Sequence, residues 1–138
     1  MTSPQPSGGS PRITSHRDLI VWQKSMQLAA AAYQLARRLP PDERFGLRVQ
    51  MQRAAVSVVA NIAEGHGRLG KGDYVRGLSI ARGSLMELEC LMELGATVGY
   101  FDLDAVHPAL ATADEIGRML WVLIRKLGAR GILPRTSL

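Results

Sequence analysis

Cysteine and aromatic residues are scarce in this chain of 138 residues, and long uncharged apolar runs are lacking. The one cysteine, Cys90, cannot form an internal disulfide, so nothing indicates a disulfide-stabilised secreted domain. No stretch approaches the roughly 18 consecutive apolar residues of a membrane span. The first residues include no apolar run typical of a signal peptide. We therefore expect a cytoplasmic protein.

Residues that usually carry chemistry are few and dispersed. The three histidines fall in separate parts of the chain, and the Glu-x-x-His pattern of di-iron bundles is lacking. The segment 65–72 nearly matches the phosphate-binding pattern G-x-x-x-x-G-K-[ST], but Gly72 replaces the required hydroxyl and a predicted helix, not a strand, precedes it. We expect a flexible basic loop there, and no enzymatic activity, cofactor or metal.

The positive charge is absent from one long segment. Between Arg82 and Arg118 there is no lysine or arginine, and seven carboxylates give that segment a charge of −7. Because the whole chain carries +5, the remainder carries +12. Such polarity is typical of a surface that binds phosphates or of a basic patch that meets an acidic one.

Apolar residues recur at helical spacing in four segments, which predicts helices over 18–39, 43–64, 73–98 and 102–127. Pro40 and Pro41 end the first helix, and Gly65 is expected to cap the second. Residues 1–17 are predicted to be a flexible tail, 18–128 one domain and 129–138 a C-terminal tail. Short connections and the lack of an alternating β pattern predict an all-α fold, an antiparallel up-down-up-down four-helix bundle.

The first two predicted helices each carry two apolar stripes. In the 18–39 helix, the stripe assigned to the core is Leu19, Trp22, Met26, Ala29, Tyr33 and Ala36. A lone bundle needs one stripe per helix, so the second stripes predict a homo-oligomer interface, with a single wide core arc as the alternative. The interface candidates are Val21, Leu28, Leu35, Val49, Val56, Ala60 and Ala63.

Polar residues form a ribbon along the otherwise apolar 43–64 helix. Arg53, Ser57, Asn61 and Glu64 are spaced at i, i+4, i+8 and i+11. Buried polar groups need partners, and the 73–98 helix offers Arg82 and Glu89. We expect these six residues to form a structural polar network rather than a ligand site.

Basic residues surround the predicted connections between helices. The candidates for contact with nucleic acid are Arg48, Arg68, Lys71 and Arg76, and a second basic group lies at the C-terminus, with Arg125, Lys126, Arg130 and Arg135. Arginine suits phosphate recognition because its planar group donates in a fork. Aromatic residues make up only 5% of the chain, which favours backbone contacts over base readout.

Several motifs together resemble a known family. These are Asp18-Leu19-Ile20-Val21-Trp22, then Arg53-Ala-Ala-Val-Ser57, Asn61-Ile-Ala-Glu-Gly65 and Gly83-Ser-Leu-Met-Glu-Leu-Glu89. In this order and spacing, over about residues 16–127, the sequence resembles the four-helix bundle family encoded in intervening sequences of bacterial 23S ribosomal RNA genes. That family is similar in fold to the accessory variability protein of diversity-generating retroelements, a homopentamer that binds nucleic acid and a reverse transcriptase. The resemblance implies a helical bundle, a pentamer and a link to RNA.

The function expected from these patterns is that of a non-enzymatic, self-associating bundle that binds structured RNA or a nucleoprotein partner through basic surfaces. The alternative is a protein-interaction or scaffold module, such as an accessory protein to a reverse transcriptase, with no direct nucleic-acid binding. In that case the acidic segment of one subunit would meet the basic region of another.

Overall fold

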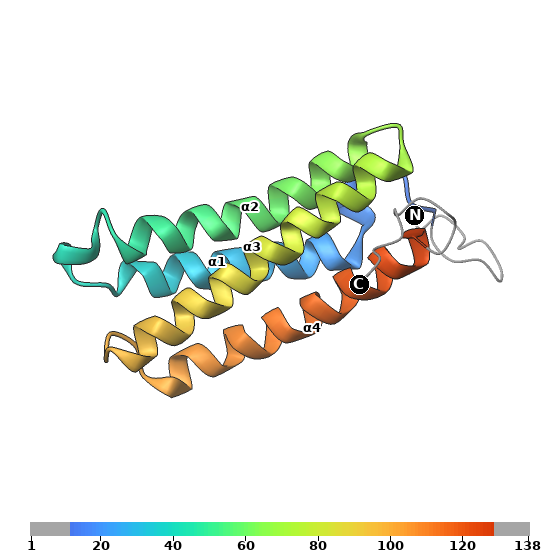
Figure 1. Ribbon diagram of the computed structural model, residues 1–138. Helices are drawn as coiled ribbons and strands as arrows, with labels where there is room; N and C mark the ends of the chain where they lie inside the picture. The colour runs from blue at the N-terminus through green and yellow to red at the C-terminus, as the bar shows by residue number, and fades with distance from the viewer. Residues whose placement is uncertain (1–11, 129–138) are drawn as a thin grey trace, which may run out of the picture.

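The protein is a bundle of four helices, seen in a computed structural model that describes residues 12–128. The helices are α1 (Ile20–Arg37), α2 (Leu47–Gly67), α3 (Lys71–Thr97) and α4 (Leu103–Leu127), with short 3-10 turns at His16–Asp18 (η1) and Pro41–Glu43 (η2). Each helix packs against the next, and α1 also packs against α4 (Figure 1). The predicted fold class, an all-α four-helix bundle, is confirmed.

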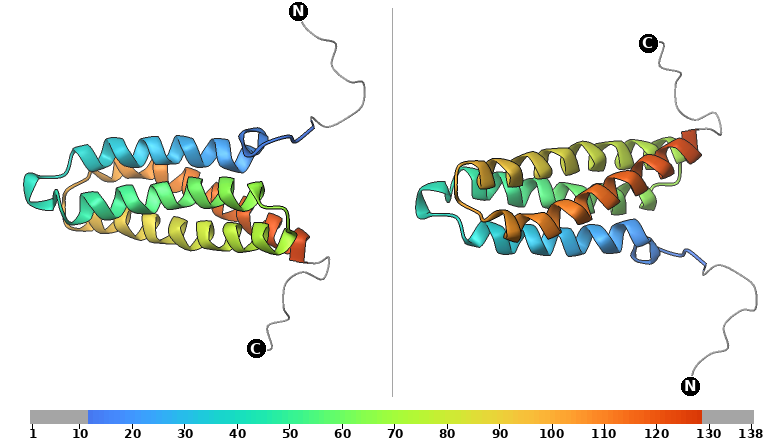
Figure 2. Two further views of the ribbon diagram at one scale, coloured as in Figure 1. Left: turned by 90° about the horizontal axis from the view of Figure 1, so that it is seen from above. Right: turned by 90° about the horizontal axis from the view of Figure 1, so that it is seen from below.

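The chain reverses direction at each connection, so the bundle has two distinct ends (Figure 2). At the η2 end lie the α1–α2 and α3–α4 connections, residues 38–46 and 98–102. At the η1 end lie η1, the α2–α3 connection of residues 68–70, and the last turn of α4. Most of each predicted tail falls in 1–11 and 129–138, outside the described residues.

Glu43 fixes the position at which α2 begins. Its carboxylate accepts hydrogen bonds from the Leu47 backbone N–H at 3.0 Å and from the Tyr100 hydroxyl at 2.9 Å. These two bonds, the Leu47 bond foremost, lower the pKa of the Glu43 carboxyl. The carboxylate thus caps the first turn of α2 from four residues upstream and ties it to the α3–α4 connection. This explains why α2 begins at Leu47 rather than at the predicted residue 43.

The predicted end of the second helix is wrong. Gly65 does not cap α2 but lies buried inside it, and the helix continues to Gly67. α3 begins at Lys71, so the predicted loop over 65–72 shrinks to a connection of residues 68–70. Gly65 instead permits a close contact between helices: a Cβ on Gly65 would lie 3.1 Å from the Cα of Gly77 on α3.

The interface assignment within α1 is wrong, and the alternative of a single wide core arc describes this helix better. Val21, Leu28 and Leu35, predicted as interface residues, are buried in the core of the single chain. In the stripe predicted as core, Met26 is 43% exposed and Ala36 is buried. The other four residues are half-buried and pack against the core, namely Leu19, Trp22, Ala29 and Tyr33. Both stripes are apolar and helically spaced, so the period alone does not tell which one faces the other helices.

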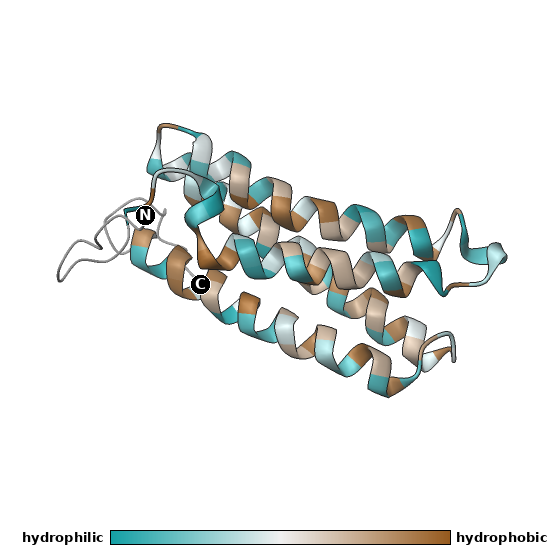
Figure 3. Ribbon diagram, turned by 180° about the vertical axis from the view of Figure 1, so that it is seen from behind, coloured by the Kyte–Doolittle hydropathy of each residue, from teal (hydrophilic) through white to brown (hydrophobic). Residues whose placement is uncertain are grey.

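The predicted division of α2 agrees better with the structure. Met51, Ala54 and Val58 are buried, as expected of the core stripe. The residues of the second stripe, Val49, Val56, Ala60 and Ala63, are half-buried or exposed. Figure 3 shows apolar segments recurring along the helices and hydrophilic ones gathered at the turn that precedes α2. The described chain therefore leaves an apolar stripe of α2 without cover.

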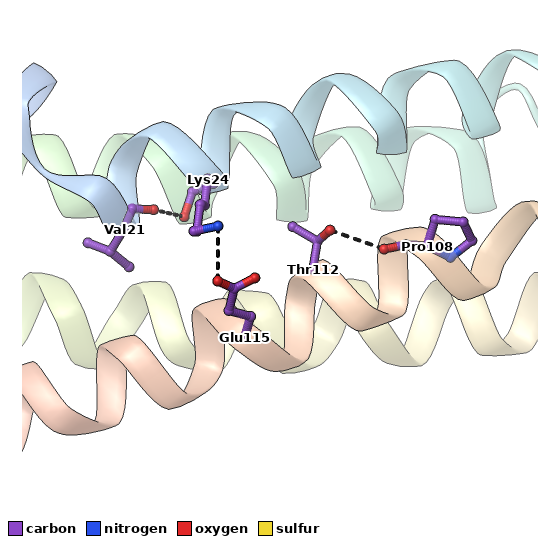
Figure 4. Close-up of polar contacts among 6 residues, drawn as sticks. Val21, Lys24, Pro108, Thr112 and Glu115 are labelled. Carbon is purple, nitrogen blue, oxygen red and sulfur yellow. Dashed lines mark hydrogen bonds and ion pairs between the residues drawn. The ribbon is translucent and has the colours of Figure 1, made fainter.

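An ion pair connects α1 to α4 near the middle of the bundle. The Lys24 ammonium lies 2.9 Å from a carboxylate oxygen of Glu115, and both side chains are partly exposed (Figure 4). Such a pair contributes at most about 1 kcal/mol. It also fixes a direction, because Lys24 is the one charged residue of α1 before Arg37 at the helix end, and its side chain points toward Glu115 on α4 (Figure 4).

Candidate nucleic-acid interface

The four predicted phosphate-contacting residues separate into two groups. Arg68, Lys71 and Arg76 are exposed at the η1 end, around the α2–α3 connection. Arg48 is the second residue of α2 and lies at the η2 end. Twenty residues of helix between Arg48 and Arg68 span about 30 Å. The prediction that Arg48 belongs to the same surface is wrong, because a helix of this length places its two ends on opposite sides of the molecule.

The end of α4 brings further cations to the η1 end, which sequence reasoning treated as a separate patch. Figure 2 shows the last turns of α4 at the same end of the bundle as the α2–α3 connection, and Figure 1 shows them on the other side of that end. We call this surface the basic end, and it comprises the exposed side chains of Arg17, Arg68, Lys71, Arg76, Arg125 and Lys126. The predicted C-terminal residues Arg130 and Arg135 lie outside the described residues. Four helices that reverse direction at each connection place the α2–α3 connection and the end of α4 at the same end of the bundle. The predicted fold was therefore the signal from which the two basic groups could have been assigned to one end.

Few carboxylates neutralise the basic end. Within residues 12–128, Arg68 is its one member in an ion pair, at 3.3 Å from Glu64, and both side chains are mostly exposed. Asp18, at the same end, accepts hydrogen bonds from the Thr14 and Ser15 backbone and from the Thr14 hydroxyl. These bonds, the Thr14 backbone bond foremost, lower the pKa of the Asp18 carboxyl. The carboxylate therefore already has its donors within its own turn.

The α2–α3 connection borders a polar hollow of about 290 Å³. Arg68 and Arg76 line it together with Asn61 and Asp73, and its floor is formed where Gly65 meets Gly77. The two arginines share the hollow with the carboxylates of Glu64 and Asp73 and with the Ile80 side chain, so polar groups of both charges line it. The glycine contact thus brings α2 and α3 together and also leaves space between the two arginines.

The predicted polar network exists in a smaller form. The hydroxyl oxygens of Ser57 and Ser84 lie 2.6 Å apart and connect α2 to α3. The Asn61 amide donates to the backbone carbonyl of Ser57 at 2.8 Å and to its hydroxyl at 3.1 Å. Glu64 pairs with Arg68, and Arg53 is exposed on α2. The core of the network is therefore Ser57, Asn61 and Ser84.

Arg82 and Glu89 do not belong to this network, contrary to prediction. Arg82 lies two residues from Ser84, a rotation of about 200° around the helix, and so faces α4 instead of α2. Its guanidinium lies 5.2 Å from the ring centre of Trp121. Glu89 lines the same α3–α4 cleft. Burial, and then the charges of Glu93 and Asp114, raise the pKa of the Glu89 carboxyl.

Removing the hydrogen bond between Ser57 and Ser84 is expected to lower the free energy of unfolding by about 1 kcal/mol. The double variant Ser57→Ala with Ser84→Ala should lose little more than either single variant, because the first substitution already breaks the bond. Urea denaturation of the four proteins measures this coupling. Strictly additive losses would show that the two hydroxyls do not act as a pair.

Within residues 12–128, no three side chains of His, Cys, Asp or Glu lie close enough together to hold a metal ion. None of the helices in that part of the chain is long and apolar enough to cross a membrane.

Residues 17–122 match the family described as 23S rRNA-intervening sequence protein. The chain belongs to this family. The resemblance drawn from the motifs around Asn61 and Gly83 is confirmed. No curated protein matches the sequence.

A solved structure supports the same assignment. It is a protein of unknown function of the S23 ribosomal protein family from Bacteroides thetaiotaomicron, 25% identical in sequence, with a TM-score of 0.71. The match covers 76% of this chain and 98% of the other. This chain therefore contains a fold similar to nearly the whole of that neighbour.

Proposed function

We propose that this member of the family is a non-enzymatic, self-associating bundle that binds structured RNA through its basic end. The observation that carries the proposal is the gathering of six exposed cations from α2, α3, α4 and η1 at one end of the bundle. Exposed arginine and lysine side chains bind phosphates and release condensed counterions. The family name, which refers to ribosomal RNA, agrees with such a ligand.

The opposite end of the bundle is less suited to RNA. Its four arginines share the η2 end with five carboxylates, so positive and negative charges alternate there. The arginines are Arg37, Arg38, Arg44 and Arg48, and the carboxylates are Asp42, Glu43, Glu93, Asp102 and Asp104. At the basic end, six cations face three carboxylates, those of Asp18, Glu64 and Asp73. Phosphate binding therefore favours the η1 end.

Replacing Arg68, Lys71 and Arg76 together by alanine is expected to weaken binding to structured RNAs of different sequence about equally. Because each phosphate contact contributes close to 0.9 to the slope of log affinity against log salt, the slope should flatten by roughly 2 to 3. Titrations of labelled RNA between low and physiological salt measure both quantities. The control is Arg37→Ala with Arg38→Ala and Arg48→Ala at the η2 end, which should leave the slope nearly unchanged.

An absence of RNA and DNA binding by the wild-type protein at low salt would reject this function. The basic end would then be assigned to an acidic protein surface, as in the scaffold alternative.

Self-association is assigned to the outer face of α1 and α2. We define this outer face by its partly exposed apolar residues, Trp22, Met26, Ala29, Tyr33, Val49, Val56, Ala60 and Ala63. Lys24 points away from it toward Glu115, and Arg53 stands at its edge. An uncharged helical face with several alanines suits close packing against a second copy. Five subunits is the number that the family resemblance favours.

A further inference from the structure

Trp121 is an exposed tryptophan that is not among the residues of the basic end. It lies on α4 about one and a half turns before the helix ends, with 48% of its surface exposed. Trp22, the other tryptophan, is half-buried and packs against His16. An indole combines a large apolar face with a polar N–H group, and tryptophan is therefore enriched at binding interfaces.

Two arginines flank the Trp121 ring. The guanidinium of Arg82 on α3 lies 5.2 Å from the ring centre, and that of Arg125, one turn further along α4, lies 5.8 Å from it. Within residues 12–128, neither arginine is in an ion pair. Both distances lie in the range of cation–π attraction. The indole and the two guanidinium groups therefore form a preassembled, positively charged aromatic surface.

The ring borders a hollow of about 310 Å³ between α3 and α4. We call it the Trp121 hollow, and its lining includes Arg82, Glu89, Asp114 and Gly117. Gly117 leaves it open, since a Cβ there would reach only the Leu85 side chain, at 3.5 Å. The volume is close to the lower limit of about 300 Å³ seen for small-ligand sites.

The charges around the hollow select what can enter it. Glu89 on α3 and Asp114 on α4 place one carboxylate on each wall, where a carboxylate would repel a phosphate group but accept hydrogen bonds from a base. The Asp114 carboxylate is paired with Arg118, which also lines the hollow, at 3.0 Å. Arg82 and Arg125 stand at the indole, where phosphates next to an inserted base would lie. An uncharged, planar group flanked by anions matches this arrangement.

We propose that Trp121, with Arg82 and Arg125, is a stacking platform for one unpaired base of an RNA whose backbone is held by the basic end. This inference rests on the proposed function and specifies its ligand as RNA with an unpaired nucleotide next to a helical segment. Base stacking on an aromatic ring is tolerant of sequence, because every base has a π face. The platform adds recognition of RNA shape to the phosphate contacts.

The test compares two RNAs of the same stem: a hairpin with an unpaired loop, and a blunt duplex. The tryptophan emission that Trp121→Phe removes is that of Trp121, and in the wild type the hairpin should quench this part of the emission while the duplex should not. Trp121→Leu should weaken hairpin binding about tenfold and leave duplex binding unchanged, whereas Trp121→Phe, which keeps an aromatic face, should retain most of the affinity. Circular dichroism checks that the Leu variant remains helical.

The outcomes separate this inference from the function on which it rests. Equal affinity of wild type and Trp121→Leu for the hairpin, with normal salt dependence, would overturn the stacking platform and leave phosphate binding intact. If the Trp121 emission falls as the protein concentration rises in the absence of RNA, Trp121 lies in a subunit contact, and the stacking platform is also overturned. If neither RNA binds to the wild type, both the platform and the proposed function fail.

Discussion

Replacing Gly77 by alanine is expected to destabilise the bundle by about 2–3 kcal/mol, although the change adds a single methyl group. A Cβ at this position would lie 2.6 Å from the Asn61 carbonyl oxygen and 2.9 Å from the Gly65 Cα. Both atoms belong to the backbone of α2, so no side chain can move aside to make room. The two helices with the most extensive contact in the bundle would have to separate.

Gly83, on the same helix, supplies a matched control with the opposite sign. It is exposed, and a Cβ there would meet no atom within 4 Å. Gly83→Ala should therefore stabilise the protein by about 0.5–1 kcal/mol, because alanine restricts the unfolded chain and favours the helix. Urea denaturation of both variants at one protein concentration measures the difference. Equal midpoints for the two variants would mean that α2 and α3 do not meet at Gly65 and Gly77.

Glutamate at positions 56 and 60 is expected to convert the assembled protein to monomers. Val56 is 48% exposed and Ala60 is also exposed in the single chain, so Val56→Glu with Ala60→Glu should leave each bundle folded. In a subunit interface the same carboxylates would be buried without partners, which costs several kcal/mol. Light scattering at micromolar concentration should show a multimer for the wild type and a monomer for the variant.

Leu94→Glu tests whether the effect is specific to the outer face. Leu94 lies on α3 and has the same exposed fraction, 48%, but is not part of the α1–α2 face. This variant should remain a multimer. A monomeric wild type would reject self-association, and loss of assembly by Leu94→Glu alone would move the interface to α3.

The sequence predicted the number and approximate bounds of the helices well, because apolar spacing and the proline pair Pro40-Pro41 are local signals. It assigned Val21, Leu28 and Leu35 to an interface, although their stripe is the more hydrophobic of the two on α1 and lies in the core. Gly65 was predicted to be a cap because glycine often ends helices. Only the packing of α2 against α3 distinguishes a glycine that caps a helix from one that permits a close contact between two helices.

The candidate site was predictable in part. Arg68, Lys71 and Arg76 were grouped correctly because they are close in sequence. Arg48 was grouped with them because it lies close to the connection between α1 and α2, although the length of α2 places it at the η2 end. Trp121 was missed, because whether a lone aromatic residue is buried depends on how far α3 and α4 separate around Gly117. Such features follow from tertiary packing and leave no local signal.

The central claim is that RNA binds at the basic end, and photo-crosslinking of the assembled wild-type protein to a structured RNA tests it most directly. After digestion, mass spectrometry identifies the peptides that carry nucleotides. Crosslinks are predicted in peptides that contain residues 64–82 and 118–127, which share the η1 end. Crosslinks confined to residues 37–48 and 93–104, at the η2 end, would contradict the account.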